Sequence, residues 1–135
     1  MCDQCGAPVA ASASCAERFD LLLALDHSRA EPWGSRHGLA FAAFTLQHSR
    51  GASAETVQRC IEMLHRTCNL GEDRTYVANS FRSESGGVSP PSPSSHHGAP
   101  DTFAFTIDDM GDFAADSYAE RLDAWCRATL AAWSR

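Results

Sequence analysis

Six cysteines are the residues of this 135-residue sequence best suited to chemistry, and two of them open it as Cys2-x-x-Cys5-Gly6. Two thiolates at this spacing can bind one tetrahedral ion from a tight turn, and the glycine permits a backbone that directs amides at sulfur. One such pair supplies half of a zinc site. Since no second Cys-x-x-Cys follows, two further ligands must come from elsewhere in the chain.

The same motif also occurs in redox dithiols, in which a reversible disulfide between Cys2 and Cys5 would replace the metal. A redox Cys-x-x-Cys usually lies at a helix start within a βαβ unit, and no such unit is predicted here. We therefore favour a metal and keep a thiol redox protein as an alternative. No basic start or apolar run typical of an export signal accompanies the motif, so we expect a cytoplasmic, reducing location.

The pattern of apolar residues predicts an all-α fold in a single domain over residues 1–135. A capping box at Ser14-Cys15-Ala16-Glu17 begins the first helix. Pro32 and Gly34 then separate it from the second helix. The fold class is an antiparallel helical hairpin with two further helices and an N-terminal Cys-x-x-Cys knuckle. We expect helices over about 15–29, 36–48, 54–70 and 112–133.

Composition and charge limit the remaining possibilities. Residues 85–100 are rich in Ser, Pro, Gly and His, and we expect a flexible loop there. Thr106-x-x-Asp109 predicts a short capped helical turn. No stretch reaches the roughly 18–20 apolar residues of a membrane span. The net charge of −6 argues against nucleic-acid binding, so any partner is expected to be a protein or a small molecule.

The remaining metal ligands follow from how the first two helices must pack. A short connection makes neighbouring helices antiparallel, so the start of the first lies beside the end of the second. Cys15 is at that start and His48 at that end, each on the inward stripe of its helix. We expect Cys2, Cys5, Cys15 and His48 to bind one zinc ion. Cys60 is a reserve ligand, because the third helix begins near the same corner.

The opposite end of the hairpin brings Asp26 and His37 together. Each lies eleven residues from the ligand on its own helix, which is about 16 Å at a rise of 1.5 Å per residue. The two pairs therefore cannot share one ion. A structural hydrogen bond between Asp26 and His37 is the favoured interpretation. The alternative is a small metalloenzyme in which the pair acts as acid and base beside a pocket lined by Phe41 and Trp33.

The other chemically interesting side chains fit a packing role better. Cys68 and Cys126 are expected in the core, because a buried free cysteine behaves as a small hydrophobe. Trp125 and Trp133 are at helical spacing and are expected there too. A site of three thiolates and one imidazole fills the tetrahedron of zinc, so the metal is more consistent with structure than with hydrolysis. We therefore expect an accessory or interaction protein, and an enzyme only as the alternative.

The order of these motifs resembles an uncharacterised bacterial family that is known only as a domain of unknown function. The resemblance covers most of the chain, and the Gln-His pair is its most specific piece. It implies no established activity and supports the site rather than a reaction. The matching motifs are Cys2-x-x-Cys5-Gly6, Cys15, His37-x-Leu39, Phe44-x-Leu46-Gln47-His48 and the final helix with Trp125 and Trp133.

Three features depart from the pattern of that family. Phe44 stands where a tyrosine is usual, and Cys60 stands where a histidine is expected in the third helix. Exchange of histidine for cysteine preserves the capacity to bind a metal, which keeps Cys60 of interest. The Ser/Pro-rich loop over residues 85–100 is also unlike the usual linker.

Overall fold

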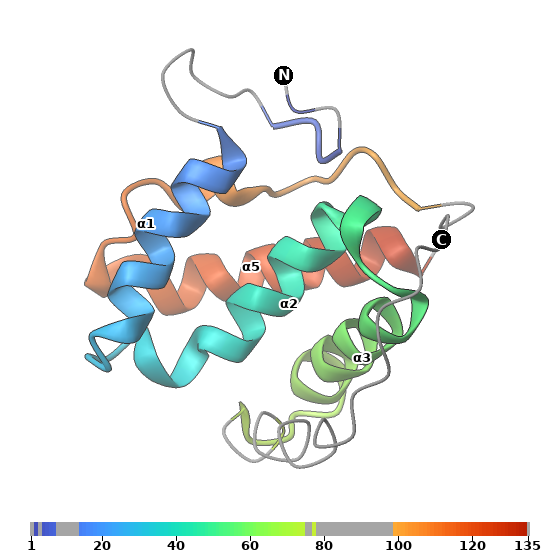
Figure 1. Cartoon of the computed structure of the whole chain (residues 1–135). Coiled ribbons are helices and arrows are strands. Elements are labelled where there is room, and N and C mark those ends of the chain that lie inside the picture. Colours follow the sequence, from blue (N-terminus) through green and yellow to red (C-terminus); the bar gives the residue numbers. More distant parts are fainter. Residues whose placement is uncertain (1, 3, 8–13, 75–76, 78–98, 135) are drawn as a thin grey trace.

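The computed structural model of the chain describes residues 2, 4–7, 14–74, 77 and 99–134, and this part is all-helical with no strand, as predicted (Figure 1). The predicted loop at 85–100 lies outside these residues except for its last two. Short helical turns connect or extend the main helices: η1 (Gly34–Arg36), η2 (Ser49–Gly51), η3 (His65–Asn69) and η4 (Ile107–Met110). The main helices are α1 (Cys15–His27), α2 (His37–Gln47), α3 (Ala54–Leu64) and α5 (Ala115–Trp133).

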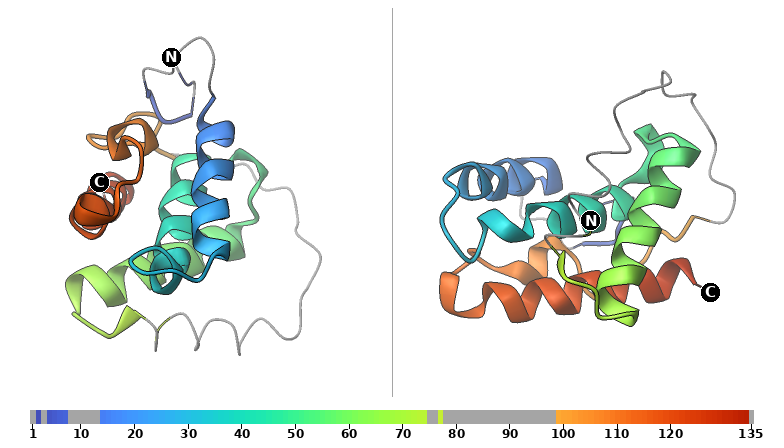
Figure 2. Two further views of the ribbon diagram at one scale, coloured as in Figure 1. Left: turned by 90° about the vertical axis from the view of Figure 1, so that its left-hand side faces the viewer. Right: turned by 90° about the horizontal axis from the view of Figure 1, so that it is seen from below.

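Helices α1 and α2 form the predicted antiparallel hairpin, which Figure 2 shows from the side. Halfway along it the rings of Phe19 and Phe44 stack with centroids 4.1 Å apart. At the end near the connection, His37 Nδ1 lies 2.8 Å from a carboxylate oxygen of Asp26. These contacts fix the register of the two helices, and thereby bring the start of α1 beside the end of α2.

Helix α2 is the central element, since it packs most extensively on α3 and α5 and much less on α1. It is mostly apolar, and Ala40, Ala42, Ala43 and Leu46 are fully buried. Small side chains let neighbouring helices approach closely along this helix. Helix α5 supplies the largest buried side chains, along the stripe expected from the sequence: Tyr118, Leu122, Trp125, Cys126 and Thr129.

Two helix ends differ from the predicted ones because the backbone enters the left-handed region. Helix α1 ends at His27 rather than near residue 29, and Arg29 has φ +60°. Helix α5 begins at Ala115 rather than near 112, because Gly111 (φ +67°) and Phe113 (φ +62°) precede it. Helical geometry requires negative φ, so neither helix can include these residues. The capped turn predicted at Thr106 is confirmed as η4, with both hydrogen bonds of a capping box to Asp109.

The third predicted helix, over 54–70, is only partly α-helical. Its α-helical part ends at Leu64, and the chain continues as a π-helical turn, η3. The amide of Leu70 donates to the carbonyl of His65 at 3.2 Å, across five residues. Such a turn contains an additional residue, so the side chains beyond it are rotated relative to those of a regular α-helix.

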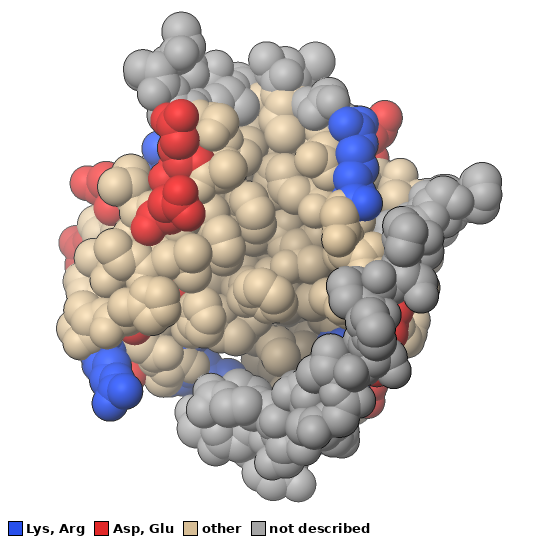
Figure 3. All heavy atoms as spheres, in the orientation of Figure 1, with Lys and Arg blue, Asp and Glu red and all other residues tan. Residues whose placement is uncertain are grey.

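None of the described helices is both long enough and apolar enough to cross a bilayer. On the face seen in Figure 3, acidic side chains gather near α1, whereas the visible basic side chains are well separated from one another. This distribution agrees with the net charge of −6.

Candidate metal centre

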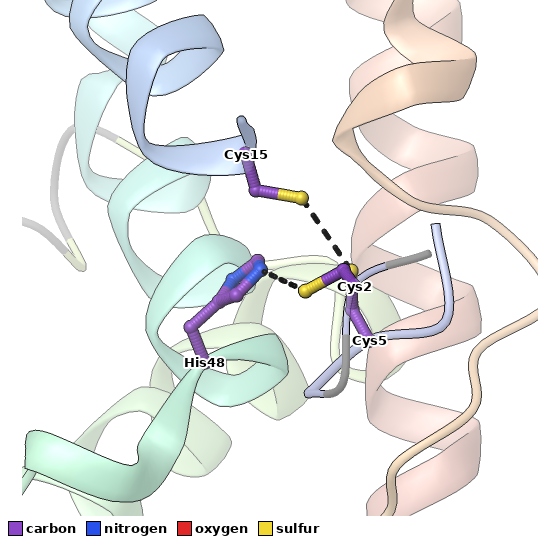
Figure 4. Close-up of side chains that lie close together, drawn as sticks. All are labelled: Cys2, Cys5, Cys15 and His48. Carbon is purple, nitrogen blue, oxygen red and sulfur yellow. Dashed lines mark hydrogen bonds between the residues drawn. The ribbon is translucent and has the colours of Figure 1, made fainter. Parts of the chain in front are cut away.

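Four side chains from three parts of the chain converge at the corner where α1 begins and α2 ends (Figure 4). Cys2 and Cys5 come from the N-terminal knuckle, Cys15 from α1, and His48 directly follows α2. One donor atom of each residue lies within 4.8 Å of the donor atoms of the other three. The side chains predicted as ligands are therefore brought together by the fold.

The knuckle, residues 2 and 4–7, is a tight turn that directs both of its thiols to this corner. The amide of Cys2 donates to the carbonyl of Ala7, and the amide of Gly6 donates to the carbonyl of Cys2, each at 2.9 Å. Gly6 has φ +79°, a conformation that favours glycine. The turn leaves Cys5 with no exposed surface. Gln4, also in the turn, contacts the chain beyond α2: its Oε1 accepts a hydrogen bond from the amide of Arg50, just beyond His48.

Cys15 is the first residue of α1 and is positioned by the cap of that helix. The Ser14 side chain accepts a hydrogen bond from the amide of Glu17 at 3.2 Å, as expected of an N-cap. A cap fixes where a helix begins, and hence where the side chain of its first residue points. Cys15 is 6% exposed, and its sulfur lies 3.8 Å from that of Cys5.

The imidazole of His48 is oriented by α2. Its Nδ1 donates to the carbonyl of Phe44 at 3.0 Å, one turn earlier, and its ring stacks on the Phe44 ring with centroids 4.2 Å apart. Because Nδ1 carries the proton in this arrangement, Nε2 is the ring nitrogen turned to the thiols, and it lies 3.6 Å from the sulfur of Cys2. Metal-ligating histidines are held in the same way, by a hydrogen bond from the other ring nitrogen.

Two of the six donor–donor separations match the edges of a zinc tetrahedron, and the other four are no longer than 4.8 Å. With Zn–S bonds of about 2.3 Å and a Zn–N bond of about 2.0–2.1 Å, two sulfurs lie about 3.8 Å apart and a sulfur and a nitrogen about 3.6 Å apart. The observed distances are 3.8 Å for Cys5 and Cys15 and 3.6 Å for Cys2 and His48. The donor set therefore has the chemistry and the spacing to hold a metal ion.

Burial dominates the electrostatics of the thiols. It raises the pKa of Cys5 far above its usual value and that of Cys15 to about 11. At Cys2 burial also acts upward, but hydrogen bonds from the amides of Cys5 and Gln4 outweigh it and lower the pKa. Desolvation therefore disfavours three thiolates in this corner. A bound cation reverses that preference, because it compensates the negative charge directly.

The other candidate ligand, Cys60, does not belong to the group of four. It is 4% exposed, burial raises the pKa of its thiol to about 11, and its side chain contacts Thr45 of α2. The third helix therefore places Cys60 in the packing with α2 rather than among the converging donors.

The Asp26–His37 pair lies at the far end of the hairpin, as predicted. The Asp26 side chain is 1% exposed and that of His37 is 43% exposed. Of the two aromatic residues expected to line a pocket there, Phe41 has its ring centroid 6.5 Å from that of His37. Trp33 instead packs toward Tyr118 of α5, and its indole N–H donates to the carbonyl of Phe113 at 2.9 Å.

The side chains that hold the candidate ligands in place were not predicted from the sequence. Phe19, Phe44 and His48 form a continuous stack, and Phe44 is one helical turn before the ligand. Gln47 is also buried, and its amide nitrogen donates to the carbonyl of Phe105 and to Thr129. The i, i+4 spacing of Phe44 and His48 was the available signal for the stack. The role of Gln47 depends on residues far away in the chain.

A family model described as a family of unknown function, DUF5946, matches residues 1–134. The chain belongs to DUF5946. This finding confirms the membership expected from the motifs, although the family has no assigned activity. No curated protein and no solved structure matches the chain. For this member of DUF5946, the geometry of the site therefore carries the functional argument.

Proposed function

We propose that this chain is a small cytoplasmic zinc protein in which one Zn²⁺ is bound by Cys2, Cys5, Cys15 and His48. The observation that carries the proposal is the convergence of these four donors within 4.8 Å of one another, with two of the pairs at the spacing of a zinc tetrahedron. Thiolate and imidazole ligands suit zinc. A set of three thiolates and one imidazole is an accepted closed zinc site.

The metal in this proposal is structural. Four protein ligands fill a tetrahedron and leave no open position for a substrate, which a catalytic zinc keeps. Cys5 and Cys15 are buried. The zinc would join the knuckle, α1 and α2, and so hold the N-terminal segment on the hairpin. The role that fits a closed site is an accessory or interaction protein rather than an enzyme.

A second candidate function is acid–base chemistry by Asp26 and His37. The observation in its favour is a buried carboxylate that orients a half-exposed imidazole at 2.8 Å. This arrangement leaves Nε2 of His37 available for a proton, as in a general base held by a carboxylate. The same contact also locks the hairpin register, so stability measurements on His37 variants separate the two roles.

Metal analysis of protein purified without chelator tests the principal proposal. We expect one zinc per chain in the wild type and none in Cys5→Ser, because the loss of a buried ligand opens the tetrahedron. Cys60→Ala is the matched control: it also removes a buried thiol, but it should keep the zinc. The melting temperature should fall further in Cys5→Ser than in Cys60→Ala, since the binding energy of a structural metal contributes to the stability of the fold.

Two results would overturn the proposal. One is a metal-free wild type whose melting temperature does not change when zinc is added. The other is a reversible disulfide between Cys2 and Cys5 in metal-free protein, which is the signature of the thiol redox alternative.

A further inference from the structure

A second pair of thiols lies outside the metal centre, at the wall of a cavity of about 360 Å³. Cys68 of η3 and Cys126 of α5 both line it, and each thiol shifts the pKa of the other. The Cys126 thiol also donates to the carbonyl of Leu39 at 3.8 Å. Cys68 is half-buried, whereas Cys126 is 1% exposed. Both cysteines were expected in the core. Cys126 lies there, whereas Cys68 is only partly buried at its edge. The cavity gives small molecules a route to Cys68.

The surroundings of Cys68 favour its thiolate. Arg127 Nη1 donates to the carbonyl of Cys68 at 3.1 Å, which places the guanidinium beside this residue. The neighbouring Cys126 thiol lowers the pKa of Cys68, and burial opposes this effect. The charge of Arg127 lowers the pKa further, while that of Asp123, its ion-pair partner, raises it. The pKa of Cys126 is raised well above its usual value by the contact with Cys68 and by burial. The two thiols are therefore unequal, with the proton held at Cys126.

The cavity has the size and lining for a small polar reactant. Its volume is within the usual range for small-molecule pockets, about 300–1,000 Å³. Arg36 and Arg74 contribute to the wall, and the carboxylates of Glu72 and Asp123 that face it are paired with arginines 66 and 127. It also includes part of the π-helical turn, a feature frequently found at functional sites.

We propose that Cys68 and Cys126 form a peroxide-reactive dithiol, in which Cys68 is the attacking residue and Cys126 the resolving one. This site is independent of the proposed metal centre. Its reactant is a small hydroperoxide, and its product is an intramolecular disulfide between η3 and α5.

The chemistry balances without any further reagent. The Cys68 thiolate attacks the terminal oxygen of the hydroperoxide, so that an S–O bond forms and the O–O bond breaks. The leaving alkoxide or hydroxide takes up a proton, and Cys68 becomes a sulfenic acid. Cys126 then loses its proton and attacks the Cys68 sulfur, so that the S–S bond forms and water leaves. Overall, two thiols are oxidised by two electrons and the hydroperoxide is reduced to an alcohol or water.

Peptide mapping after treatment with one equivalent of hydrogen peroxide tests the proposal. All eleven basic residues are arginine, so trypsin places Cys60, Cys68 and Cys126 on separate peptides, 60–66, 67–74 and 122–127. We expect peptides 67–74 and 122–127 to become disulfide-linked and to separate again on reduction. Peptide 60–66 is an internal control, because Cys60 is a buried core thiol like Cys126 but does not line the cavity. Cys60 should therefore stay reduced.

Two variants separate attack from resolution. In Cys126→Ala, peptide 67–74 should carry a sulfenic acid that dimedone traps, because no resolving thiol remains. In Arg127→Gln, oxidation of Cys68 should be several-fold slower, and Arg127→Lys should restore part of the rate. The proposal is overturned if the wild-type peptides 67–74 and 122–127 stay reduced, whether or not peptide 60–66 is oxidised. It is equally overturned if Cys68 and Cys60 are oxidised at the same rate.

Discussion

The two ring nitrogens of His48 have different roles at the candidate metal centre. Nδ1 is held by the Phe44 carbonyl, and the ring lies on the Phe44 ring, which itself lies on Phe19. Nε2 then points to the three sulfurs without any rotation of the side chain. A ligand that is already oriented loses less conformational entropy when the metal binds, so the aromatic stack should contribute to metal affinity.

Substitution of Phe44 tests that contribution. In Phe44→Leu the imidazole loses its stacking partner, and we expect the zinc dissociation constant to rise by about tenfold, as for other outer-shell supports of a metal. The stoichiometry at saturation should not change. Competition with a chromophoric chelator measures the constant. Phe41→Leu, on the same helix but 45% exposed, is the control, and equal affinities in the two variants would contradict the role of the stack.

At the other end of the hairpin, the Asp26–His37 contact is expected to stabilise the fold. His37→Ala leaves a buried carboxylate without its partner, and should lower the free energy of unfolding by about 1–2 kcal/mol. The same substitution in an Asp26→Asn background should lower the free energy of unfolding by less, because the neutral amide of Asn needs no compensating charge. Urea denaturation of the four proteins of this double-mutant cycle gives the coupling directly. Identical costs in both backgrounds would show that the pair has no structural role.

Among the elements, α2 links the metal corner to the core through two adjacent residues. His48 turns to the metal centre, while Gln47 turns to Phe105 and to Thr129 of α5 and is 1% exposed. Gln47 Nε2 donates to the carbonyl of Phe105 at 2.7 Å and to Thr129 Oγ1 at 2.9 Å. The hydroxyl of Thr129 in turn donates to the carbonyl of Trp125. Gln47 and His48 thus place a core contact and a candidate metal ligand side by side at the end of one helix.

This connection predicts a large effect for a single amide. Gln47→Leu should lower the free energy of unfolding by about 1–3 kcal/mol, because the buried Thr129 hydroxyl and the half-buried Phe105 carbonyl lose their donor. Gln58→Leu on α3 is the matched control, since Gln58 is exposed and such surface changes usually stay within about 0.5 kcal/mol. Chemical denaturation gives both values. Equal stability of the two variants would exclude a structural role for the Gln47 amide.

The sequence predicts those features of the elements that neighbouring residues in the chain determine. Two kinds of local pattern were informative. One is the capping boxes at Ser14 and Thr106. The other is the equal spacing of the predicted contact residues on the two helices, Cys15 to Asp26 and His37 to His48. They correctly indicated the start of α1, the turn η4 and the hairpin register. The π-helical turn could not be predicted, because nothing between His65 and Asn69 encodes the extra residue. It becomes apparent only from contacts such as Arg127 to the carbonyl of Cys68, fifty-nine residues away.

For the molecule as a whole, the helices differ in how firmly they are held. Helix α2 packs most extensively on α3 and α5 and far less on α1. The knuckle is joined to the rest through its thiols at the metal corner, through Gln4, and where Ala7 is buried and Gly6 lies beside Asp101 and Thr102. A metal at this corner would therefore stabilise the N-terminal part of the chain more than the core built by the other helices.

Removal of the metal by a chelator should make this difference visible. We expect hydrogen exchange to accelerate in residues 4–7 and in the first turn of α1, because these regions lose their link to His48. Exchange in the middle of α5 should change much less, since that helix is held by packing. Hydrogen–deuterium exchange with mass spectrometry measures both regions in one experiment. Uniform acceleration along the chain would mean that the metal supports the whole fold instead.

The central claim is that three sulfurs and one imidazole nitrogen bind a single zinc ion. X-ray absorption at the zinc edge of the purified protein measures this most directly. We predict a first shell of three sulfurs at about 2.3 Å and one nitrogen at about 2.0–2.1 Å. A first shell composed only of oxygen and nitrogen, or protein that binds no zinc, would contradict the claim.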